Sequence, residues 1–484
     1  MDDRQKVKLE AISIPFVMIV ALLVSVGIRV GWLVIDFGSL ENDPDAYKAL
    51  AEGYSTSGTF GRMGSDSLVR ATAYRPPGYV WLLSWLVMDG KLNDLAVGIL
   101  HGVLGGLTCC LVARIAFLLS ASYLIAAAAS MCVAVDPILL RQSTQTMTET
   151  LATFIAMSLW WGWIEMNASS GSPWASTLWM LLLGITAGIG SLVRPTTLVS
   201  ITVWILLCTG LQLWSNARKK KVSTINTFGA TDGYGLIIKD WAVFLVGMAL
   251  VMTPWVFRNA TQIGRATMTT THGGYTILLA NNPVLYENIR NHGWDRQWDE
   301  TRFHLLWDQR RQEDPRELEY WKRSEEDILK ASSDPPKNFY FGENGEHREV
   351  SDDRLASEVA WKTISSDPTT FIKSCFVRMS WFWAVTPYRA GVSRIISLAI
   401  GVWYTSLYLC VILNVALLLR DGFHKRLPMN RLRQWIPAVA LLLSLMLVHA
   451  IYWSNMRMRA PLMPSLYAFV LVSFANLYSR RRIH

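Results

Sequence analysis

Long, uncharged apolar blocks are the feature that most constrains this chain. A helix needs about 20 apolar residues to cross the hydrocarbon core of a bilayer, and most of these blocks reach that length. Charged residues make up 17% of the chain, below the roughly 25% of soluble domains. The alternating pattern of a transmembrane barrel is missing, so the backbone must be satisfied within helices. We therefore predict an all-α polytopic membrane protein.

The blocks predict about ten membrane helices, at residues 11–35, 95–119, 122–140, 148–166, 174–193, 196–214, 240–257, 393–419, 435–453 and 461–479. Among these, 122–140 is short for a span. The first block is long and has no small-residue cleavage signature, so we predict a retained helix rather than a removed signal peptide.

Clusters of basic residues predict the orientation of these helices. They occur at residues 218–221, 420–433 and 480–482, and each adjoins the end of an apolar block. Such clusters mark the cytoplasmic side of a membrane protein. An even number of helices places both termini and all three clusters in the cytoplasm. This topology accounts for the net charge of +9 better than a nucleic-acid-binding surface does, so we predict no nucleic-acid partner and a multi-pass protein of the inner (cytoplasmic) membrane.

Two long polar segments remain on the outer side, and they define the organisation of the chain. Residues 1–257 form an N-terminal transmembrane module with a first outer loop at 36–94. Residues 258–392 form an extracytoplasmic insertion, and 393–484 supply the C-terminal helices. Within the first outer loop, 76–88 is apolar but too short to span a membrane. It predicts an interfacial or re-entrant helix with proline at its first turn.

A cluster of carboxylates follows the first apolar block. In the stretch SLENDPDAY, Glu41, Asp43 and Asp45 lie within five residues of one another, ahead of a helical pattern. Either aspartate could cap that helix, which is the structural interpretation. Ionisable groups near the membrane are costly and usually functional, which is the other interpretation, and Arg75 in the same loop supplies a cation for them.

Few other residues in the sequence are candidates for catalysis or metal binding. Glu149 begins a predicted helix at the outer boundary, where it either stabilises the helix N-terminus or supplies a second carboxylate for an acceptor or a metal. None of the six cysteines forms a pair with metal-ligand spacing, and His272 and His292 have no ligand partners nearby in the sequence. We therefore predict no metal site from these residues.

The order of the motifs carries more information than any one of them. The stretches DPDAY, GTFG and YRPPGY follow the first block, and TQTMTETLATF, GSLVRPTTL, TPWVFRNATQIG, THGGYTILLANNP and RMRAPLMP come after them. In this order the chain resembles the GT-C superfamily of membrane glycosyltransferases, in the branch of the protein O-mannosyltransferases and aminoarabinose transferases. The resemblance extends over nearly the whole chain and indicates the superfamily more strongly than the substrate.

The resemblance implies that an aspartate of the first outer loop is the general base that deprotonates the acceptor hydroxyl or amine. Asp43 stands four residues before Tyr47, which is the position that the family pattern requires. Pro44 stands where the family often has glutamate, and Asp45 is displaced by one position. We therefore expect Asp43 to be the base, with Asp45 as the alternative.

Transfer of a sugar from a lipid phosphate also needs cations that stabilise the leaving phosphate, and arginine binds phosphate through a two-pronged fork. Arg258, Arg457 and Arg459 fall at outer ends of predicted helices, and with Arg75 they are the predicted phosphate ligands. The alternative is that they anchor helices at the membrane interface. Arg194 is a candidate of second rank.

Together these features predict an inverting glycosyltransferase. It would move a sugar from a polyprenyl phosphate donor to a lipid, glycan or protein acceptor on the outer side of the membrane, in contact with membrane lipids. No cofactor is predicted with certainty, and a divalent cation stays open. The alternatives are a transporter or flippase of a lipid-linked sugar and a non-catalytic scaffold. Transporters place charges at the bilayer midplane, whereas here they gather at the outer boundary.

Overall fold

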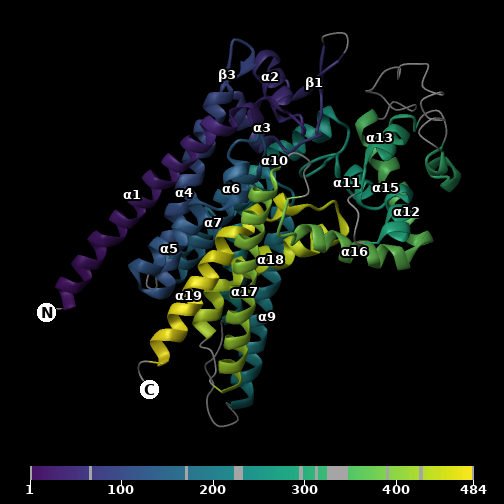
Figure 1. Cartoon of the computed structure of the whole chain (residues 1–484). Coiled ribbons are helices and arrows are strands. Elements are labelled where there is room, and N and C mark those ends of the chain that lie inside the picture. The colour runs from purple at the N-terminus through teal and green to yellow at the C-terminus, as the bar shows by residue number, and fades with distance from the viewer. Residues whose placement is uncertain are drawn as a thin grey trace.

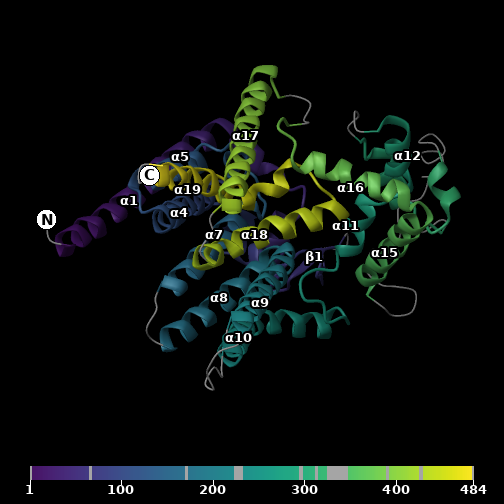
Figure 2. The same cartoon turned by 90° about the horizontal axis from the view of Figure 1, so that it is seen from below.

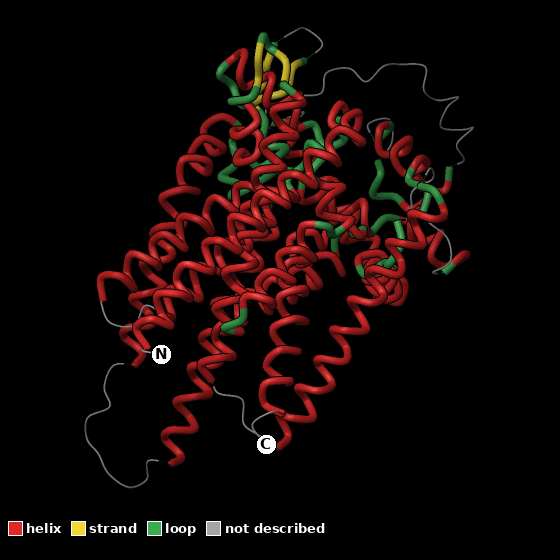
Figure 3. Tube along the Cα trace, turned by 60° about the vertical axis from the view of Figure 1, so that its left-hand side comes forward, coloured by secondary structure: helices red, strands yellow, loops and turns green. Residues whose placement is uncertain are grey.

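The computed structural model is a bundle of long helices with a smaller group of short helices beside one end of it (Figure 1). It describes residues 3–64, 68–168, 173–222, 233–293, 298–310, 314–323, 347–387, 392–424 and 429–481. Figure 3 shows that helix dominates and that the described strands are confined to one end of the bundle. The predicted all-α membrane architecture is confirmed.

The N-terminal module carries most of the long helices. Its membrane helices and the short helices between them are α1 (Asp3–Asp36), α4 (Asp94–Ser120), α5 (Tyr123–Ala134), α6 (Pro137–Gln142), α7 (Glu149–Ala168), α8 (Pro173–Val193), α9 (Thr196–Val222) and α10 (Gly233–Gln262). The C-terminal part contributes α17 (Arg394–His424), α18 (Met429–Ile451), the 3-10 helix η3 (Met456–Leu462) and α19 (Met463–Arg481).

Eight helices in the described part of the chain are long and apolar enough to cross a membrane. They correspond to eight of the ten predicted blocks. The block at 148–166 is helical as α7 but is not among the eight. The block at 122–140 does not form one span, because it breaks into α5 and α6 at Asp136 and Pro137. A proline disfavours the helical conformation of the residue before it, and Asp136 instead caps α6 by accepting from the Leu139 N–H.

The two ends of the chain lie at the same end of the bundle. Figure 1 places the start of α1 and the end of α19 there, with the lower ends of α9 and α17. These are the helix ends beside the three basic clusters, so the clusters share one side of the molecule, as predicted from an even number of crossings.

The first outer loop folds at the opposite end. It consists of the 3-10 helix η1 (Phe37–Glu41), α2 (Tyr47–Ser57), the antiparallel strands β1 (Gly61–Met63) and β2 (Val69–Ala71), α3 (Pro77–Ser84), and the strands β3 (Val87–Met88) and β4 (Lys91–Leu92). In the first hairpin, Arg62 pairs with Arg70. Of the helix predicted at 76–88, residues 77–84 are helical as α3, with Pro77 in its first turn, whereas Val87 and Met88 belong to β3.

Two glycines allow α8 and α10 to pack backbone against backbone. A Cβ atom on Gly184 would lie 2.0 Å from the Phe244 carbonyl oxygen, and one on Gly247 would lie 2.5 Å from that of Leu181. Both positions therefore require glycine. Figure 2 shows α8, α9 and α10 grouped on one side of the bundle.

The insertion predicted at residues 258–392 has a hydrophobic core of its own. Its elements are α11 (Gly273–Ala280), α12 (Pro283–His292), α13 (Thr301–Asp308), the 3-10 helix η2 (Leu318–Lys322), α15 (Arg348–Ser366) and α16 (Pro368–Phe382). One face of α15 is apolar, and its residues Ala356, Val359, Ala360 and Ile364 are buried in this core.

Candidate active site

Asp45 lies between two arginines from distant parts of the chain. Arg75 donates from Nη2 to the Asp45 Oδ1 atom at 2.8 Å and from Nε to the Asp45 carbonyl oxygen at 2.9 Å. Arg457 Nη2 lies 3.3 Å from Asp45 Oδ2. The loop before α2 presents the aspartate, the segment before α3 presents Arg75, and η3 presents Arg457, so the site joins both ends of the sequence.

Glu149 extends this contact into the bundle. Its Oε1 atom lies 3.6 Å from Arg457 Nε and 3.2 Å from Arg194 Nη1. The result is a continuous series of alternating charges, Asp45–Arg457–Glu149–Arg194, which we call the charge series. Only 4% of the Glu149 side chain is exposed, and a carboxylate so deeply buried requires cationic partners.

Helix ends place the members of the charge series. Glu149 is the first residue of α7, where a carboxylate is favoured by the helix dipole. Arg194 lies between α8 and α9 because Pro195 follows it. In the described part of the chain, Arg194 Nη1 and Arg457 Nε are buried without a hydrogen-bond partner, although both lie near Glu149. Their contact with Glu149 is therefore an ion pair without an aligned hydrogen bond.

Aromatic rings surround Arg75 at the outer end of the series. Its guanidinium lies 4.6 Å from the ring centre of Tyr74 and 5.6 Å from that of Tyr47. Burial raises the pKa of Tyr47 to about 12, against the opposing effect of Arg75, so this phenol stays protonated at neutral pH.

Asp43, the predicted base, binds the N-terminus of α2. Its Oδ1 atom accepts from the Lys48 N–H at 3.1 Å and its Oδ2 atom from the Ala49 N–H at 2.9 Å. This is the capping interaction of the structural interpretation. A carboxylate has about four acceptor positions, so capping leaves room for an acceptor hydroxyl, and the role of Asp43 as a base stays a prediction.

Two predicted phosphate ligands contact backbone carbonyl groups. Arg258 donates to the Thr72 oxygen at 2.7 Å and the Phe60 oxygen at 2.5 Å, beneath the first outer loop. Arg459 donates to the carbonyl oxygens of Phe382 and Ala384, at 2.5 and 2.8 Å, and is fully buried. Within the described part of the chain neither forms an ion pair with Asp45 or Glu149, so among the four predicted arginines the structure brings Arg457 and Arg75 to the carboxylates.

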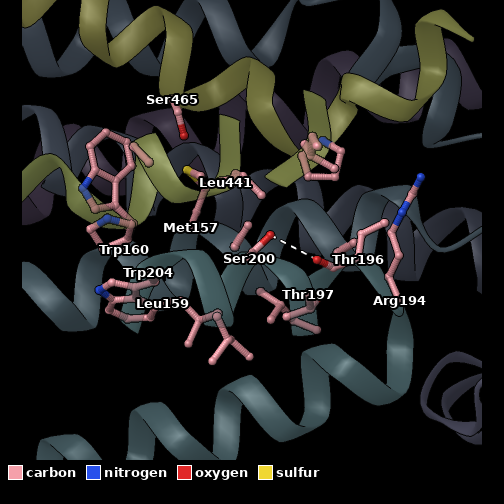
Figure 4. Close-up of a pocket in the computed structure, with 18 residues that line it drawn as sticks. Met157, Leu159, Trp160, Arg194, Thr196, Thr197, Ser200, Trp204, Leu441 and Ser465 are labelled. Carbon is pink, nitrogen blue, oxygen red and sulfur yellow. Dashed lines mark hydrogen bonds between the residues drawn. The ribbon is translucent and has the colours of Figure 1, made fainter. Parts of the chain in front are cut away.

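An apolar cavity begins at the inner end of the charge series. Arg194 lines it together with residues of α7, α9, α18, η3 and α19. Figure 4 shows Arg194 at one end of the cavity and Trp160 and Trp204 at the other. The few other polar groups in its lining are hydroxyls, such as those of Ser200 and Ser465. The cavity thus joins a hydrocarbon-like interior to a cationic group.

The sequence interpretation missed other ionisable residues at or near this site. Buried Asp136 accepts from Tyr467 Oη at 2.6 Å and from Tyr404 Oη at 3.2 Å. His449 is buried within α18, with Nδ1 2.9 Å from the Trp453 oxygen and Nε2 without a partner in the described part of the chain. The available signal was their place in apolar blocks, where ionisable groups are rare.

The carboxylates of the site do not form a metal centre. Among the described residues there is no group of three or more His, Cys, Asp or Glu side chains that could hold a metal ion. Asp45 and Glu149 each contact arginines, whereas a divalent cation needs several oxygen ligands without competing cations. Asp45 and Glu149, paired with arginines as they are, therefore do not fit a metal.

Comparison with known proteins agrees with the resemblance carried by the motifs. Residues 86–263 match the family model described as dolichyl-phosphate-mannose-protein mannosyltransferase. This segment, less than half of the chain, runs from the end of α3 to just beyond α10 and includes Glu149, Arg194 and Arg258. The predicted resemblance to lipid-phosphate-dependent glycosyltransferases is confirmed for this part of the chain. No curated protein matches the chain.

Solved structures of similar arrangement include two membrane proteins. ArnT from Cupriavidus metallidurans, bound to undecaprenyl phosphate, is 14% identical, with a TM-score of 0.41 over 98% of this chain and 78% of that one. The oligosaccharyltransferase AglB from Archaeoglobus fulgidus, in complex with an inhibitory peptide and a dolichol-phosphate, is 14% identical, with a TM-score of 0.48 over 96% of this chain. The chain matches half of the AglB length. Another structure of the Archaeoglobus fulgidus oligosaccharyltransferase is a complex with Zn and sulfate. It is 12% identical, with a TM-score of 0.48, and the match covers 96% of this chain and 50% of that one.

Proposed function

We propose that this protein is an inverting glycosyltransferase that takes a sugar from a polyprenyl phosphate and transfers it to an acceptor on the outer side of the cytoplasmic membrane. The observation that carries the proposal is the charge series, which links an apolar cavity inside the bundle to a carboxylate of the outer loop. A lipid-linked sugar has its parts in a matching order: an apolar chain, then an anionic phosphate, then a polar sugar.

The arginines of the series suit the phosphate. Arg194 and Arg457 each have a buried N–H group with no hydrogen-bond partner among the described residues, and both converge on Glu149. Arginine forms short, charge-assisted bonds to phosphate oxygens. The apolar chain would then lie in the cavity that Arg194 lines. The matched family is named for a sugar donor of this chemical type.

The proposed reaction is a direct displacement at the anomeric carbon. A loop carboxylate takes the proton of the acceptor hydroxyl or amine while the oxygen or nitrogen of that group forms a bond to the anomeric carbon. The bond between this carbon and the phosphate oxygen breaks, and the polyprenyl phosphate leaves with the electron pair. Arg194 and Arg457 stabilise the negative charge on the leaving phosphate. A single displacement inverts the anomeric configuration.

We assign the base to Asp43 and keep Asp45 as the alternative. Asp45 is held by two arginines, which suits it to fixing their positions. Asp43 contacts backbone N–H groups and has acceptor capacity left.

The outward orientation is also a proposal. The basic helix ends lie at the end of the bundle opposite the first outer loop (Figure 1), which supports a cytoplasmic location for them. Single cysteines at Asn216 and Ala266, in a chain whose native cysteines are replaced, test this in intact cells. We expect an impermeant thiol reagent to modify the Ala266→Cys chain and to spare the Asn216→Cys chain. Modification of the Asn216→Cys chain alone would show that the protein has the opposite orientation.

The activity is tested with the purified chain in nanodiscs, given polyprenyl-phosphate-mannose or polyprenyl-phosphate-glucose and an extract of membrane lipids and glycans. We expect free polyprenyl phosphate to accumulate together with a glycosylated product. Asp94→Asn is the matched control, because Asp94 pairs with Lys48 in the same outer region but outside the charge series. Movement of intact donor across liposome membranes, without cleavage, would instead support the flippase alternative.

A further inference from the structure

Glu349 joins the insertion to the first outer loop. It lies in the first turn of α15, and its Oε1 atom accepts from the Ala73 N–H at 2.9 Å. The hydroxyl groups of Thr72 and Thr271 also donate to its carboxylate. One side chain of the insertion therefore binds two consecutive residues that are about 276 positions earlier in the chain.

Further hydrogen bonds hold the same short segment from its other side. Thr72 Oγ1 accepts from the Tyr74 N–H at 3.0 Å, and the Ala73 carbonyl oxygen accepts from the Thr271 N–H at 2.9 Å. Thr270 Oγ1 donates to the Tyr74 oxygen at 2.5 Å. Residues 72–74 thus lie fixed between α15 and the segment before α11.

The next residue in the chain is Arg75, whose side chain donates to both the carboxylate and the carbonyl oxygen of Asp45. Because Thr72 and Ala73, which Glu349 holds, lie only three and two residues before Arg75, a shift of the segment moves the guanidinium as well. Burial raises the pKa of Glu349, although hydrogen bonds from Thr72 and Ala73 oppose that effect. Arg62 and Arg258 supply the positive charge that faces it.

We propose that Glu349 is a positioning residue for the transferase site, which fixes residues 72–74 so that Arg75 meets Asp45. The docking of the insertion on the outer loop thereby sets the geometry of the catalytic carboxylates. This inference rests on the proposed function, since it assigns a role to Glu349 in that reaction, but its structural part stands independently of it.

The contact predicts a specific kinetic effect. The hydrogen-bond partners of Glu349 are Thr72, Ala73 and Thr271, away from Arg194, Arg457 and the lining of the apolar cavity, so its loss should leave donor binding intact. Displacement of the groups that orient the acceptor and its base should lower kcat, since small misplacements in an active site cost one to two orders of magnitude.

Asp353 is the matched control on the same helix. It lies one turn after Glu349 and accepts from the Gly274 N–H at 2.6 Å, with Arg265 at 3.7 Å. Its contacts stay within the insertion and the segment before it, without reaching residues 72–75. Asp353→Asn therefore removes a partly buried carboxylate from α15 but leaves the contact between Glu349 and residues 72–74 in place.

The test compares Glu349→Ala, Glu349→Gln, Asp353→Asn, Arg75→Ala and the double variant Glu349→Ala/Arg75→Ala in nanodiscs. We expect Glu349→Ala to lower kcat about 10-fold or more, with an unchanged Kd for polyprenyl phosphate, and Glu349→Gln to recover part of the rate. In the Arg75→Ala background the same change should have little further effect, because both act through one contact. Equal losses for Asp353→Asn, or additive losses in the double variant, would overturn the proposal.

A second measurement separates this inference from the proposed function. Amide hydrogen exchange of residues 69–76 should accelerate in Glu349→Ala and stay at the level of the unchanged protein in Asp353→Asn. If the unchanged protein transfers no sugar, the proposed function fails while the exchange result still decides the contact. If exchange in Glu349→Ala stays at the level of the unchanged protein, the positioning role is wrong even where activity is present.

Discussion

Arg457 Nη2 lies 3.3 Å from Asp45 Oδ2, although 412 residues separate the two in the sequence. The contact joins the 3-10 helix before the last membrane helix to the loop after the first one. It therefore closes the bundle around the candidate site at its outer end. Arg457 also reaches Glu149, so its loss would leave two carboxylates with one cation fewer.

The two loop aspartates should differ in their effect on turnover. We expect Asp43→Asn to lower kcat by about 10²- to 10⁴-fold with donor binding largely kept, because removal of a general base acts on the chemical step. Asp45→Asn should change both kcat and the Kd for polyprenyl phosphate, because Asp45 pairs with Arg457, a proposed phosphate ligand. Single-turnover rates and equilibrium binding separate the two. The reverse pattern would move the base to Asp45.

Substitutions of four arginines should fall into two groups by their effect, with Arg194 and Arg457 in one and Arg258 and Arg459 in the other. Loss of a charge-assisted bond to phosphate costs about 1.5–3 kcal/mol, so Arg457→Ala and Arg194→Ala should weaken polyprenyl phosphate binding roughly 10- to 100-fold. Arg258→Ala and Arg459→Ala should mainly lower the melting temperature, because these side chains bind backbone carbonyls. Calorimetric titration and thermal unfolding measure the two effects. Strong loss of binding in Arg258→Ala alone would restore it as a phosphate ligand.

Filling the apolar cavity should affect long lipids more than short ones. Ala438 lines the cavity from α18, and Ala438→Phe would occupy part of it. We expect weaker binding of a long polyprenyl phosphate, and a smaller change for a phosphate that carries only two isoprene units. Leu206→Phe, at a position of α9 whose side chain is 64% exposed, is the control. Equal effects on both lipids would show that the isoprenoid chain of the lipid binds outside this cavity. Melting temperatures show whether either variant is overpacked.

His272 should make stability depend on pH. Burial, with Arg75 and Arg62 nearby, lowers the pKa of His272 well below its usual value, so the folded state keeps it neutral. The unfolded chain takes up a proton near pH 6.5. The free energy of unfolding therefore falls as pH drops below that value, by at most about 1.4 kcal/mol per pH unit from this residue.

The melting temperature between pH 7 and 5 measures this dependence. We expect His272→Gln to reduce the slope and His292→Gln, a change of an exposed histidine, to leave it unchanged. Identical slopes in all three proteins would show that His272 takes up its proton in the folded state as it does in the unfolded chain, so that its pKa is not lowered.

The sequence by itself determined the helices and their order. An apolar block in lipid must satisfy its own backbone hydrogen bonds, so its length alone predicts a spanning helix. Local signals were similarly sufficient for α3, with proline at its first turn, and for the buried face of α15. The motif order indicated the family that matches residues 86–263. Asp43 could be placed at a helix start from its neighbours, which left its capping role and its catalytic role equally open.

Only the tertiary structure decided which charges meet. Arg457 and Arg459 are two residues apart in one motif, yet the first binds Asp45 and the second binds carbonyl groups in the interior. Arg194, a candidate of second rank in the sequence, lines the cavity and pairs with Glu149. The physical reason is that membrane depth follows from the local sequence, whereas the direction of a side chain and its partner depend on how distant helices pack. An arginine at the outer boundary can bind a carboxylate, a backbone carbonyl or a phosphate, and the fold selects among them.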